Sequence, residues 1–216
     1  MTLLQVTGLD KRLGGRRVLE QLELQLGAGE TGVVLGANGS GKSTLLRVLS
    51  GILQADRGRI ELSGHLLSNA PRQFKSQLGY VPDGLEVQPD LRVSEWLQLV
   101  RALRSLPRAA SAQDAGWLER LGVTALWGER LRALSFGQRK RVALAAALAG
   151  NPALLLLDEP SNGLDGTGSE LLAELLSWRT RHGKSQLIST NDREFARAVA
   201  GHCWRLEAGR LVPALD

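Results

Sequence analysis

The residues most able to do chemistry form one glycine-rich run, Gly36-Ala37-Asn38-Gly39-Ser40-Gly41-Lys42-Ser43-Thr44. Its spacing, G-x-x-x-x-G-K-[ST], is that of a loop that cradles nucleotide phosphates. Glycines let backbone N–H groups approach phosphate oxygens, and a following helix N-terminus adds partial positive charge. We predict phosphate contacts from Gly36, Asn38, Gly39, Ser40, Gly41, Lys42, Ser43 and Thr44. In such a site the Lys42 ammonium reaches the β and γ phosphates, and the Ser43 hydroxyl binds Mg²⁺.

A second candidate group follows an apolar run. Four leucines at residues 154–157 lead into Asp158 and Glu159. Ligands in open α/β sheets bind at the carboxyl ends of strands, which is where these two acids stand. Asp158 is suited to holding Mg²⁺ through water, and Glu159 to orienting or deprotonating an attacking water. A solvated strand end is the alternative, and the phosphate loop in the same chain favours the site.

A third candidate is the start of a predicted helix. Ser135 and Gln138 have the S-x-x-Q spacing of a capping box, in which each side chain accepts a hydrogen bond from the other residue's backbone N–H. The same helix start, with Gly137 in its first turn, is also an anion site suited to a second phosphate contact. Both interpretations use the same residues.

The hydrophobic pattern indicates the elements that must position these groups. Apolar and alternating runs predict strands at residues 3–9, 22–26, 31–35, 59–62 and 78–81. Helical spacing then predicts helices at 93–103, around 117–121 and at 136–149. Afterwards we expect strands at 153–157 and 186–190, helices at 167–181 and 192–200, and a hairpin of 202–206 and 210–212.

This order predicts an α/β fold in one domain, residues 1–216. Its nucleotide-binding core would have a mixed or parallel sheet with antiparallel strands at the N-terminal side. Residues 1–82 and 151–216 would form the core, and residues 83–150 an inserted α-helical subdomain that carries Ser135.

The bulk composition is that of a globular chain. With 216 residues, of which 43% are hydrophobic and 23% charged, it can bury a full core. Apolar runs are shorter than a membrane span, and the N-terminus lacks a signal-peptide pattern, so we expect a cytosolic protein. The net charge of +5 is scattered, and even the dense cluster Arg139-Lys140-Arg141 is interpreted as solvated surface. Cys203, the single cysteine, is interpreted as a structural thiol.

The motifs together resemble those of ABC-type ATPases, the nucleotide-binding subunits of ABC transporters. The phosphate loop GANGSGKST, the signature segment LSFGQRKRVALA, the strand end LLLLDEP and the loop SNGLD stand in the family's order and spacing. The resemblance covers essentially the whole chain. It implies a P-loop NTPase core with an inserted helical subdomain, and ATP and Mg²⁺ as bound groups.

The resemblance also implies a second copy or a related ABC ATPase chain. Two such domains pair head to tail, as a homodimer or a heterodimer. Each ATP then lies between the phosphate loop of one chain and Ser135, Gly137 and Gln138 of the other. Asp165, in the SNGLD loop, would lie across the dimer interface and couple the two sites.

Further roles follow from the same resemblance. Asp158 would assist Mg²⁺, and Glu159 would be the catalytic base. Residues 83–150 would dock on membrane-spanning transporter subunits. Trp127, beside a glycine in a loop, is the better candidate for a surface contact, whereas Trp96 lies on the apolar stripe of its helix.

Three positions depart from the family pattern. Leu13 stands where an aromatic residue stacks on adenine, so the base would be covered by apolar contact alone. Asp83 stands where a glutamine is usual, and its carboxylate can still approach Mg²⁺ directly or through water. Phe136 replaces a signature glycine and would crowd the approach to Gly137.

A fourth departure bears on catalysis. The family expects a histidine after Ser189-Thr190, where this chain has Asn191. That histidine contacts the γ-phosphate and helps to hold the base and the water. Asparagine stays neutral, and a neutral hydrogen bond has roughly half the strength of a charge-assisted one. We therefore expect Asn191 to keep a catalytic contact, with hydrolysis that persists through Glu159 and Lys42 but is slow.

The predicted function is that of an ATP-binding and ATP-hydrolysing subunit. It would couple MgATP-driven dimer closure to transport by separate membrane subunits, at the inner face of the cell membrane, with no nucleic acid involved. One alternative is a weakly active or inactive nucleotide-binding partner in a heteromeric pair, motivated by Leu13 and Asn191. Another is a soluble ABC ATPase that acts on DNA or ribosomes, motivated by the positive net charge.

Overall fold

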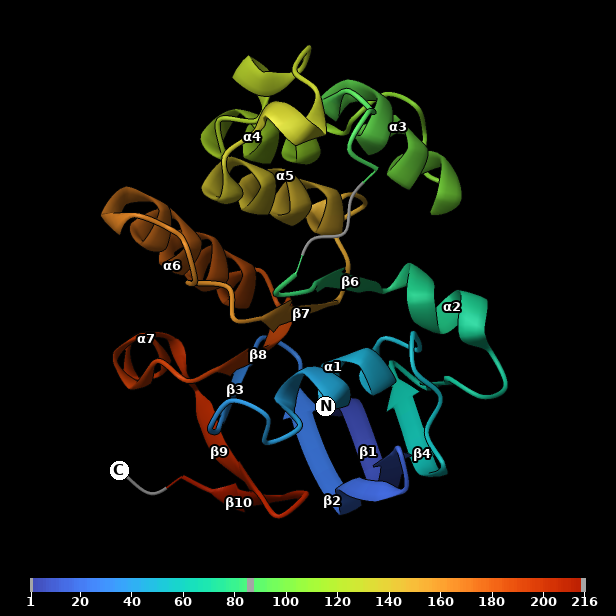
Figure 1. Ribbon diagram of the computed structural model, residues 1–216. Helices are drawn as coiled ribbons and strands as arrows, with labels where there is room; N and C mark the ends of the chain where they lie inside the picture. Colours follow the sequence, from blue (N-terminus) through green and yellow to red (C-terminus); the bar gives the residue numbers. More distant parts are fainter. Residues whose placement is uncertain (1, 85–87, 215–216) are drawn as a thin grey trace.

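Two β-sheets form the framework of the protein (Figure 1). The computed structural model describes residues 2–84 and 88–214. An antiparallel sheet has the strand order β2-β1-β4-β5, from β1 (Thr2–Leu13), β2 (Arg16–Gly27), β4 (Arg57–Leu62) and β5 (His65–Leu66). The second sheet has the order β10-β9-β3-β8-β7-β6, from β3 (Thr31–Leu35), β6 (Leu78–Val81), β7 (Leu154–Asp158), β8 (Ser185–Thr190), β9 (His202–Glu207) and β10 (Arg210–Pro213). All of its neighbours are parallel except β10 and β9, so the predicted α/β class with mixed sheets is confirmed.

The first hairpin is longer than the sequence predicted. Leu13 pairs with Arg16 across a two-residue turn in which Gly14 and Gly15 have φ angles of 54° and 79°. Positive φ at both central residues is the geometry that matches the twist of a tight hairpin, and glycine adopts it without strain. The strands therefore pair all the way to the turn. The sequence predicted only residues 3–9 and 22–26 because polar residues in the part of the hairpin next to the turn hide the alternation of apolar and polar side chains.

The parallel strands separate two hydrophobic cores. Successive side chains of a strand point to opposite faces of a sheet. One core, on the helical side, takes Val33, Leu155, Leu157 and Ile188. The other, on the side of the antiparallel sheet, takes Val34, Leu154, Leu156 and Leu187. The central strands of this sheet are rich in apolar residues because both faces of the sheet are covered.

Helices cover both faces of the parallel sheet. On the side of the antiparallel sheet lies α1 (Lys42–Leu49), whose leucines belong to the same core as β1 and β7. The opposite face is covered by α5 (Phe136–Leu148), α6 (Gly166–Arg181) and α7 (Arg193–Val199) (Figure 1). Among the described residues, no helix combines the length and the apolar character needed to cross a bilayer.

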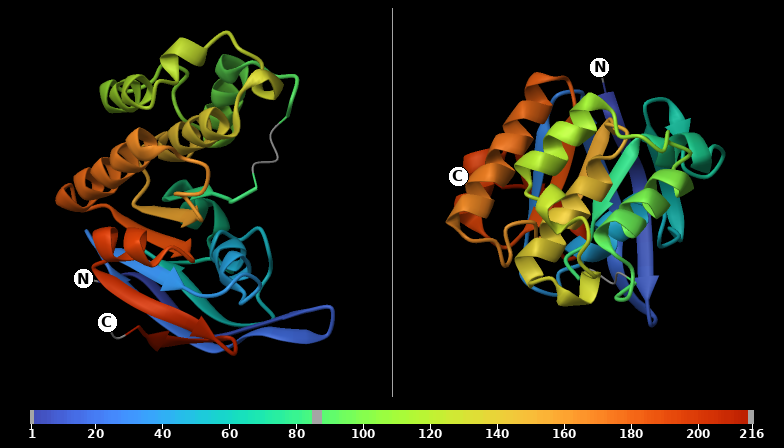
Figure 2. Two further views of the ribbon diagram at one scale, coloured as in Figure 1. Left: turned by 60° about the vertical axis from the view of Figure 1, so that its left-hand side comes forward. Right: turned by 90° about the horizontal axis from the view of Figure 1, so that it is seen from above.

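The helices that stand between β6 and α5 in the sequence lie beyond α5, on its side away from the parallel sheet (Figure 2). They are α3 (Val93–Leu103), α4 (Ala112–Arg120) and two short 3₁₀ turns, Thr124–Leu126 and Leu131–Ala133. Because α5 itself shares a core with β7 and β8, the boundary between a core and a subdomain of 83–150 stays a prediction. The sequence also missed α2 (Pro71–Ser76), a helix of six residues that is too short to show a period.

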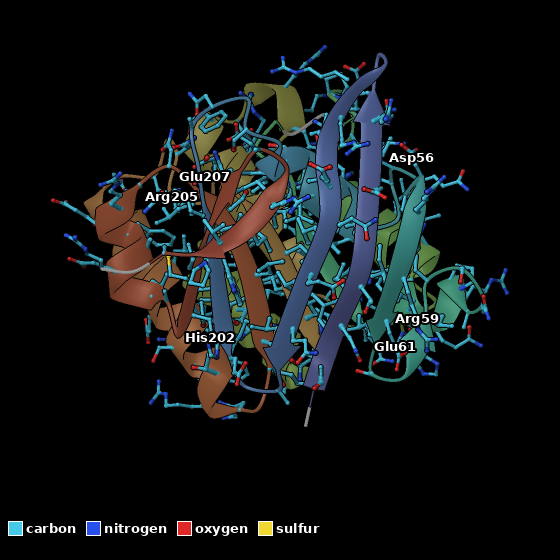
Figure 3. All side chains as sticks on the ribbon, turned by 90° about the horizontal axis from the view of Figure 1, so that it is seen from below. Asp56, Arg59, Glu61, His202, Arg205 and Glu207 are labelled. Carbon is cyan, nitrogen blue, oxygen red and sulfur yellow. The ribbon has the colours of Figure 1, made fainter. Side chains whose placement is uncertain are left out.

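Charged pairs line the outer faces of two strands, as Figure 3 shows. Arg59 and Glu61 of β4 lie 2.7 Å apart, and Arg205 and Glu207 of β9 lie 3.0 Å apart. Each pair is two residues apart along its strand and therefore shares a face. Exposed pairs of this kind add little stability, so the solvated faces leave the stability of the fold to the two cores.

Candidate functional site

The phosphate loop joins β3 to α1 at the carboxyl end of the parallel sheet (Figure 1). Gly41 ends the loop with a φ of 107°, and a Cβ atom there would lie 2.8 Å from Val18 Cγ1 of β2. A glycine is therefore required where the loop passes under β2 and turns into the helix.

The first turn of α1 has no capping side chain. Its N-cap is Gly41, which makes no side-chain hydrogen bond. The helices α4, α5, α6 and α7 are instead capped by Ser111, Ser135, Asp165 and Asp192. The backbone N–H groups at the start of α1 therefore remain available to an anion, and the helix dipole favours one there.

Lys42 points back into the loop and is almost completely buried, with 5% of the residue exposed. Its Nζ donates to the carbonyl oxygens of Gly36, at 2.8 Å, and Ala37, at 3.3 Å. The same Nζ lies 3.2 Å from Glu159 Oε1. The loop lysine and the predicted base thus form a buried ion pair.

Glu159 follows β7 in an uncommon backbone conformation. Its φ is 45°, a region that residues other than glycine seldom adopt. The backbone N–H donates to Ser189 O at 2.9 Å, and Oε2 accepts from the backbone N–H of Asn191 at 3.2 Å. Its neighbour Asp158 is buried and accepts a hydrogen bond from Ser189 Oγ at 2.5 Å. Two adjacent strands therefore fix both carboxylates beside the phosphate loop.

Asn191 connects the end of β8 to the loop. Its backbone N–H holds the Glu159 carboxylate, and its side-chain Nδ2 donates to Asn38 Oδ1 at 3.1 Å. The structure thus brings Asn191, Glu159 and Lys42 together, as the sequence predicted. Their catalytic roles remain predictions.

The start of α5 forms the predicted capping box. Ser135 Oγ accepts from Gln138 N at 3.2 Å, and Gln138 Oε1 accepts from Ser135 N at 2.8 Å. Phe136 packs its ring against Gly163, in the loop after Glu159. Among the described residues, no hydrogen bond or ion pair joins this helix start to the phosphate loop of the same chain. Within one chain, therefore, the described structure shows no polar contact of Ser135, Gly137 or Gln138 with the phosphate loop.

Three predicted residues lie at the margins of the site. Leu13, at the end of β1, is 42% exposed. Asp83 follows β6 with a half-exposed side chain, and its Oδ1 lies 3.9 Å from Lys140 Nζ. Asp165, predicted for a dimer interface, accepts a hydrogen bond from Gly168 N at 2.8 Å and so caps α6.

The prediction that Arg139, Lys140 and Arg141 form a solvated cluster was wrong. Lys140 is fully buried, and its Nζ donates to the carbonyl oxygens of Glu159 and, at 3.1 Å, of Asn162. Burial lowers the pKa of Lys140, while the nearby carboxylates of Asp83, Glu159 and Asp158 oppose that shift. The sequence held a signal, because Lys140 stands one helical turn before the buried Leu144.

The residues present fit Mg²⁺. The predicted ligands Ser43, Asp158 and Asp83 supply hard oxygen atoms, and Asp158 uses only one carboxylate oxygen in its bond to Ser189. Mg²⁺ sites at nucleotides typically combine one or two carboxylates with phosphate oxygens and water. This donor set therefore suits a metal shared with phosphates.

Tyr80 of β6 provides an internal probe of this site because it is the only tyrosine of the chain. Burial, and secondarily the charge of Asp158, raise its pKa to about 12. We expect phenolate absorbance to appear near pH 12 in the folded protein and near pH 10 in denaturant. The unfolded chain loses this proton first, so this group's contribution to stability is lost as pH rises from 10 towards 12.

The titration has a matched control. Tyr80→Phe must remove the phenolate signal, and Asp158→Asn should lower the midpoint of the folded protein. A folded-state midpoint near 10 would contradict the burial of the phenol beside Asp158.

The fold and the site define a class of protein. A phosphate loop between a strand and a helix, with acids at the end of a neighbouring parallel strand, is the arrangement of P-loop nucleotide-binding proteins. The family model for ABC transporters matches residues 19–162, and the chain belongs to this family.

Known proteins are similar to this chain in sequence and structure along nearly its whole length. A daunorubicin resistance ATP-binding protein of Streptomyces coeruleorubidus is 34% identical over 212 residues, covering 98% of this chain and 67% of that protein. An Fe(3+) ions import ATP-binding protein of Streptomyces coelicolor is 36% identical over 213 residues, covering 98% and 61%. A solved ATP binding subunit of an ABC transporter has a TM-score of 0.88 at 26% identity, covering 97% of this chain and 88% of that one. The chain thus spans about two thirds or less of the length of these curated relatives.

Proposed function

We propose that this chain binds MgATP and hydrolyses ATP as the nucleotide-binding subunit of an ABC transporter. The observation that carries the proposal is the buried contact between Lys42 and Glu159 beside the uncapped start of α1. In this proposal Lys42 is the cation for phosphate, the uncapped N–H groups of α1 bind phosphate oxygens, and Glu159 is the carboxylate base. That combination is what phosphoryl transfer to water requires.

The same contact suggests how the nucleotide prepares the base. When phosphate oxygens reach Lys42, its ammonium exchanges the carbonyl oxygens of Gly36 and Ala37 for the phosphate. The Glu159 carboxylate, still held by the Asn191 N–H, then accepts a proton from the attacking water. Ser43, Asp158 and Asp83 would hold Mg²⁺, which supplies charge neutralisation to the phosphates.

A second chain would complete the site. Within one chain Ser135 caps its own helix and Gly137 lies against Gly163 in the loop after Glu159, so we assign both residues to the nucleotide of a partner ABC ATPase. Membrane-spanning subunits would dock on residues 83–150, where Trp127 is 41% exposed.

Mixed dimers test this composite site. Lys42→Ala removes the phosphate contact, and Gly137→Asp places a negative charge where phosphate would bind. Each variant alone should have no turnover. Mixed together, they form one dimer site with an intact phosphate loop from one chain and an intact signature helix from the other, so turnover should return. Active wild-type protein without recovery in the mixture would exclude the shared site.

One observation favours the alternative of a weakly active partner. The neutral amide of Asn191 is already bound to Asn38, so it is poorly placed to add charge at a phosphate. Asn191→His should therefore raise the turnover number about fivefold, the effect of roughly 1 kcal/mol from exchanging a neutral for a charge-assisted hydrogen bond.

Steady-state phosphate release measures this effect. Asn191→Ala is the control, because it removes the side-chain amide and keeps the backbone N–H that holds Glu159. Equal turnover in the Asn191→His variant and the wild-type chain would show that this position does not limit hydrolysis.

A further inference from the structure

Lys140 is the one buried cation that touches the backbone of the predicted base among the described residues. It lies in the second turn of α5, and its Nζ reaches the carbonyl oxygens of Glu159 and Asn162. Both carbonyls belong to the loop that follows β7. The side chain therefore ties the helix to the two ends of the turn that carries the Glu159 carboxylate.

That turn needs support. Glu159 has a φ of 45°, which costs on the order of 1–3 kcal/mol for a residue that is not glycine. Its N–H is held by Ser189 O, and its carbonyl oxygen accepts from Lys140 Nζ and, at 3.3 Å, from Asn162 N. Lys42 and Asn191 hold only the carboxylate end. Without Lys140, the carbonyl at the strained position would lose its charged partner.

Stability alone does not explain a lysine at this position. A buried ammonium is desolvated, and the Asp83 carboxylate with which it pairs is 3.9 Å away. An apolar side chain of the same length would fill the space without that cost. The ammonium is therefore better explained by its hydrogen bonds to the carbonyl oxygens of Glu159 and Asn162, which hold that turn in place.

We propose that Lys140 is a positioning residue for ATP hydrolysis: it fixes the backbone of Glu159 so that the carboxylate faces Lys42 and the attacking water. This inference rests on the proposed function. Lys140 contacts no substrate atom in this scheme and acts only through Glu159.

The variant Lys140→Met tests the role because it keeps the length of the side chain and removes the ammonium. The turnover number should fall on the order of 10- to 100-fold, since small misplacements of a catalytic group have effects of this size. KM for ATP should stay near the wild-type value, and the thermal midpoint should be unchanged or higher. Lys140→Arg keeps donors and charge and should recover part of the loss. Arg141→Met, the same kind of change one residue along the helix, is the matched control.

A parallel fall in turnover and thermal midpoint, or unchanged turnover, would overturn the positioning role. Hydrogen exchange provides a readout that needs no hydrolysis. In the nucleotide-free protein, Lys140→Met should speed amide exchange in residues 159–163 and leave α5 unchanged. Unaltered exchange there would also overturn the inference, even if the wild-type chain failed to hydrolyse ATP and the proposed function were wrong.

The mixed dimers locate the effect. In the single working site, Glu159 comes from the Gly137→Asp chain and the signature helix from the Lys42→Ala chain. Adding Lys140→Met to the Gly137→Asp chain should reduce turnover more than adding it to the other chain. The opposite order would mean that Lys140 supports the helix start of α5 instead of Glu159.

Discussion

Glu159→Gln should lower the turnover number by about 10²- to 10⁴-fold, the usual contribution of a general base. An amide has nearly the shape of a carboxylate but cannot take the proton of an attacking water at neutral pH. ATP binding should persist or tighten, because Lys42 would no longer form an ion pair with residue 159 and would be free for phosphate. Phosphate release measures turnover, and equilibrium binding of ATP to the same preparation measures affinity, so the two measurements separate the effect on catalysis from the effect on binding.

Glu170→Gln is the matched control for this experiment. Glu170 lies on the exposed face of α6, so the same chemical change there should leave turnover within about twofold. Turnover of the Glu159→Gln variant within tenfold of wild type would show that another group accepts the proton. Loss of ATP binding together with turnover would instead mean that the buried pair supports the shape of the loop.

The parts of the site that could be predicted are those with local signatures. The motif of residues 36–44 is defined by glycines and a lysine at fixed spacing, and the structure places it in the connection from β3 to α1 and in the first turn of α1. Asp158 and Glu159 could be placed because four leucines mark a strand that is buried on both faces. Parallel strands end at the same edge of a sheet, so these two segments meet there without any long-range information.

What the sequence could not show depends on contacts between distant segments. The position of Lys140 one helical turn before Leu144 could have indicated that the side chain is buried, but nothing near it in the sequence identifies the carbonyl oxygen of Glu159 as its partner. The bond between Asn191 and Asn38 joins residues 153 positions apart. The outer half of the β1 and β2 hairpin was missed because polar residues hide its alternation.

One buried ion pair joins α3 to α4. Arg101 of α3 and Asp114 of α4 lie 2.7 Å apart, with side chains 11% and 7% exposed. The guanidinium also donates to Pro107 O at 2.9 Å and Ala109 O at 2.7 Å, in the connection between the two helices. Asp114 accepts in addition from Gly150 N at 3.3 Å, just beyond α5. The pair thus links three helices that would present the docking surface for membrane subunits.

Asp114→Ala should reduce the free energy of unfolding by about 3–5 kcal/mol, because Arg101 would remain buried without a counter-charge. Urea unfolding followed by tryptophan fluorescence measures this change. The matched control is Asp90→Ala, which breaks an exposed pair with Arg132 and should cost at most about 1 kcal/mol.

The double variant Arg101→Met with Asp114→Ala separates the charge from the packing. It should be more stable than Asp114→Ala alone, because no unpaired cation is then buried. If the single and double variants unfold at the same urea concentration, the loss comes from the capping box of α4, in which Asp114 and Ser111 hold each other's N–H groups, and from the bond to Gly150. Either result identifies the interaction that holds α3 and α4 against α5. A movement at the nucleotide can reach a membrane partner through this surface only if the surface stays rigid, so the same interaction would be needed for coupling.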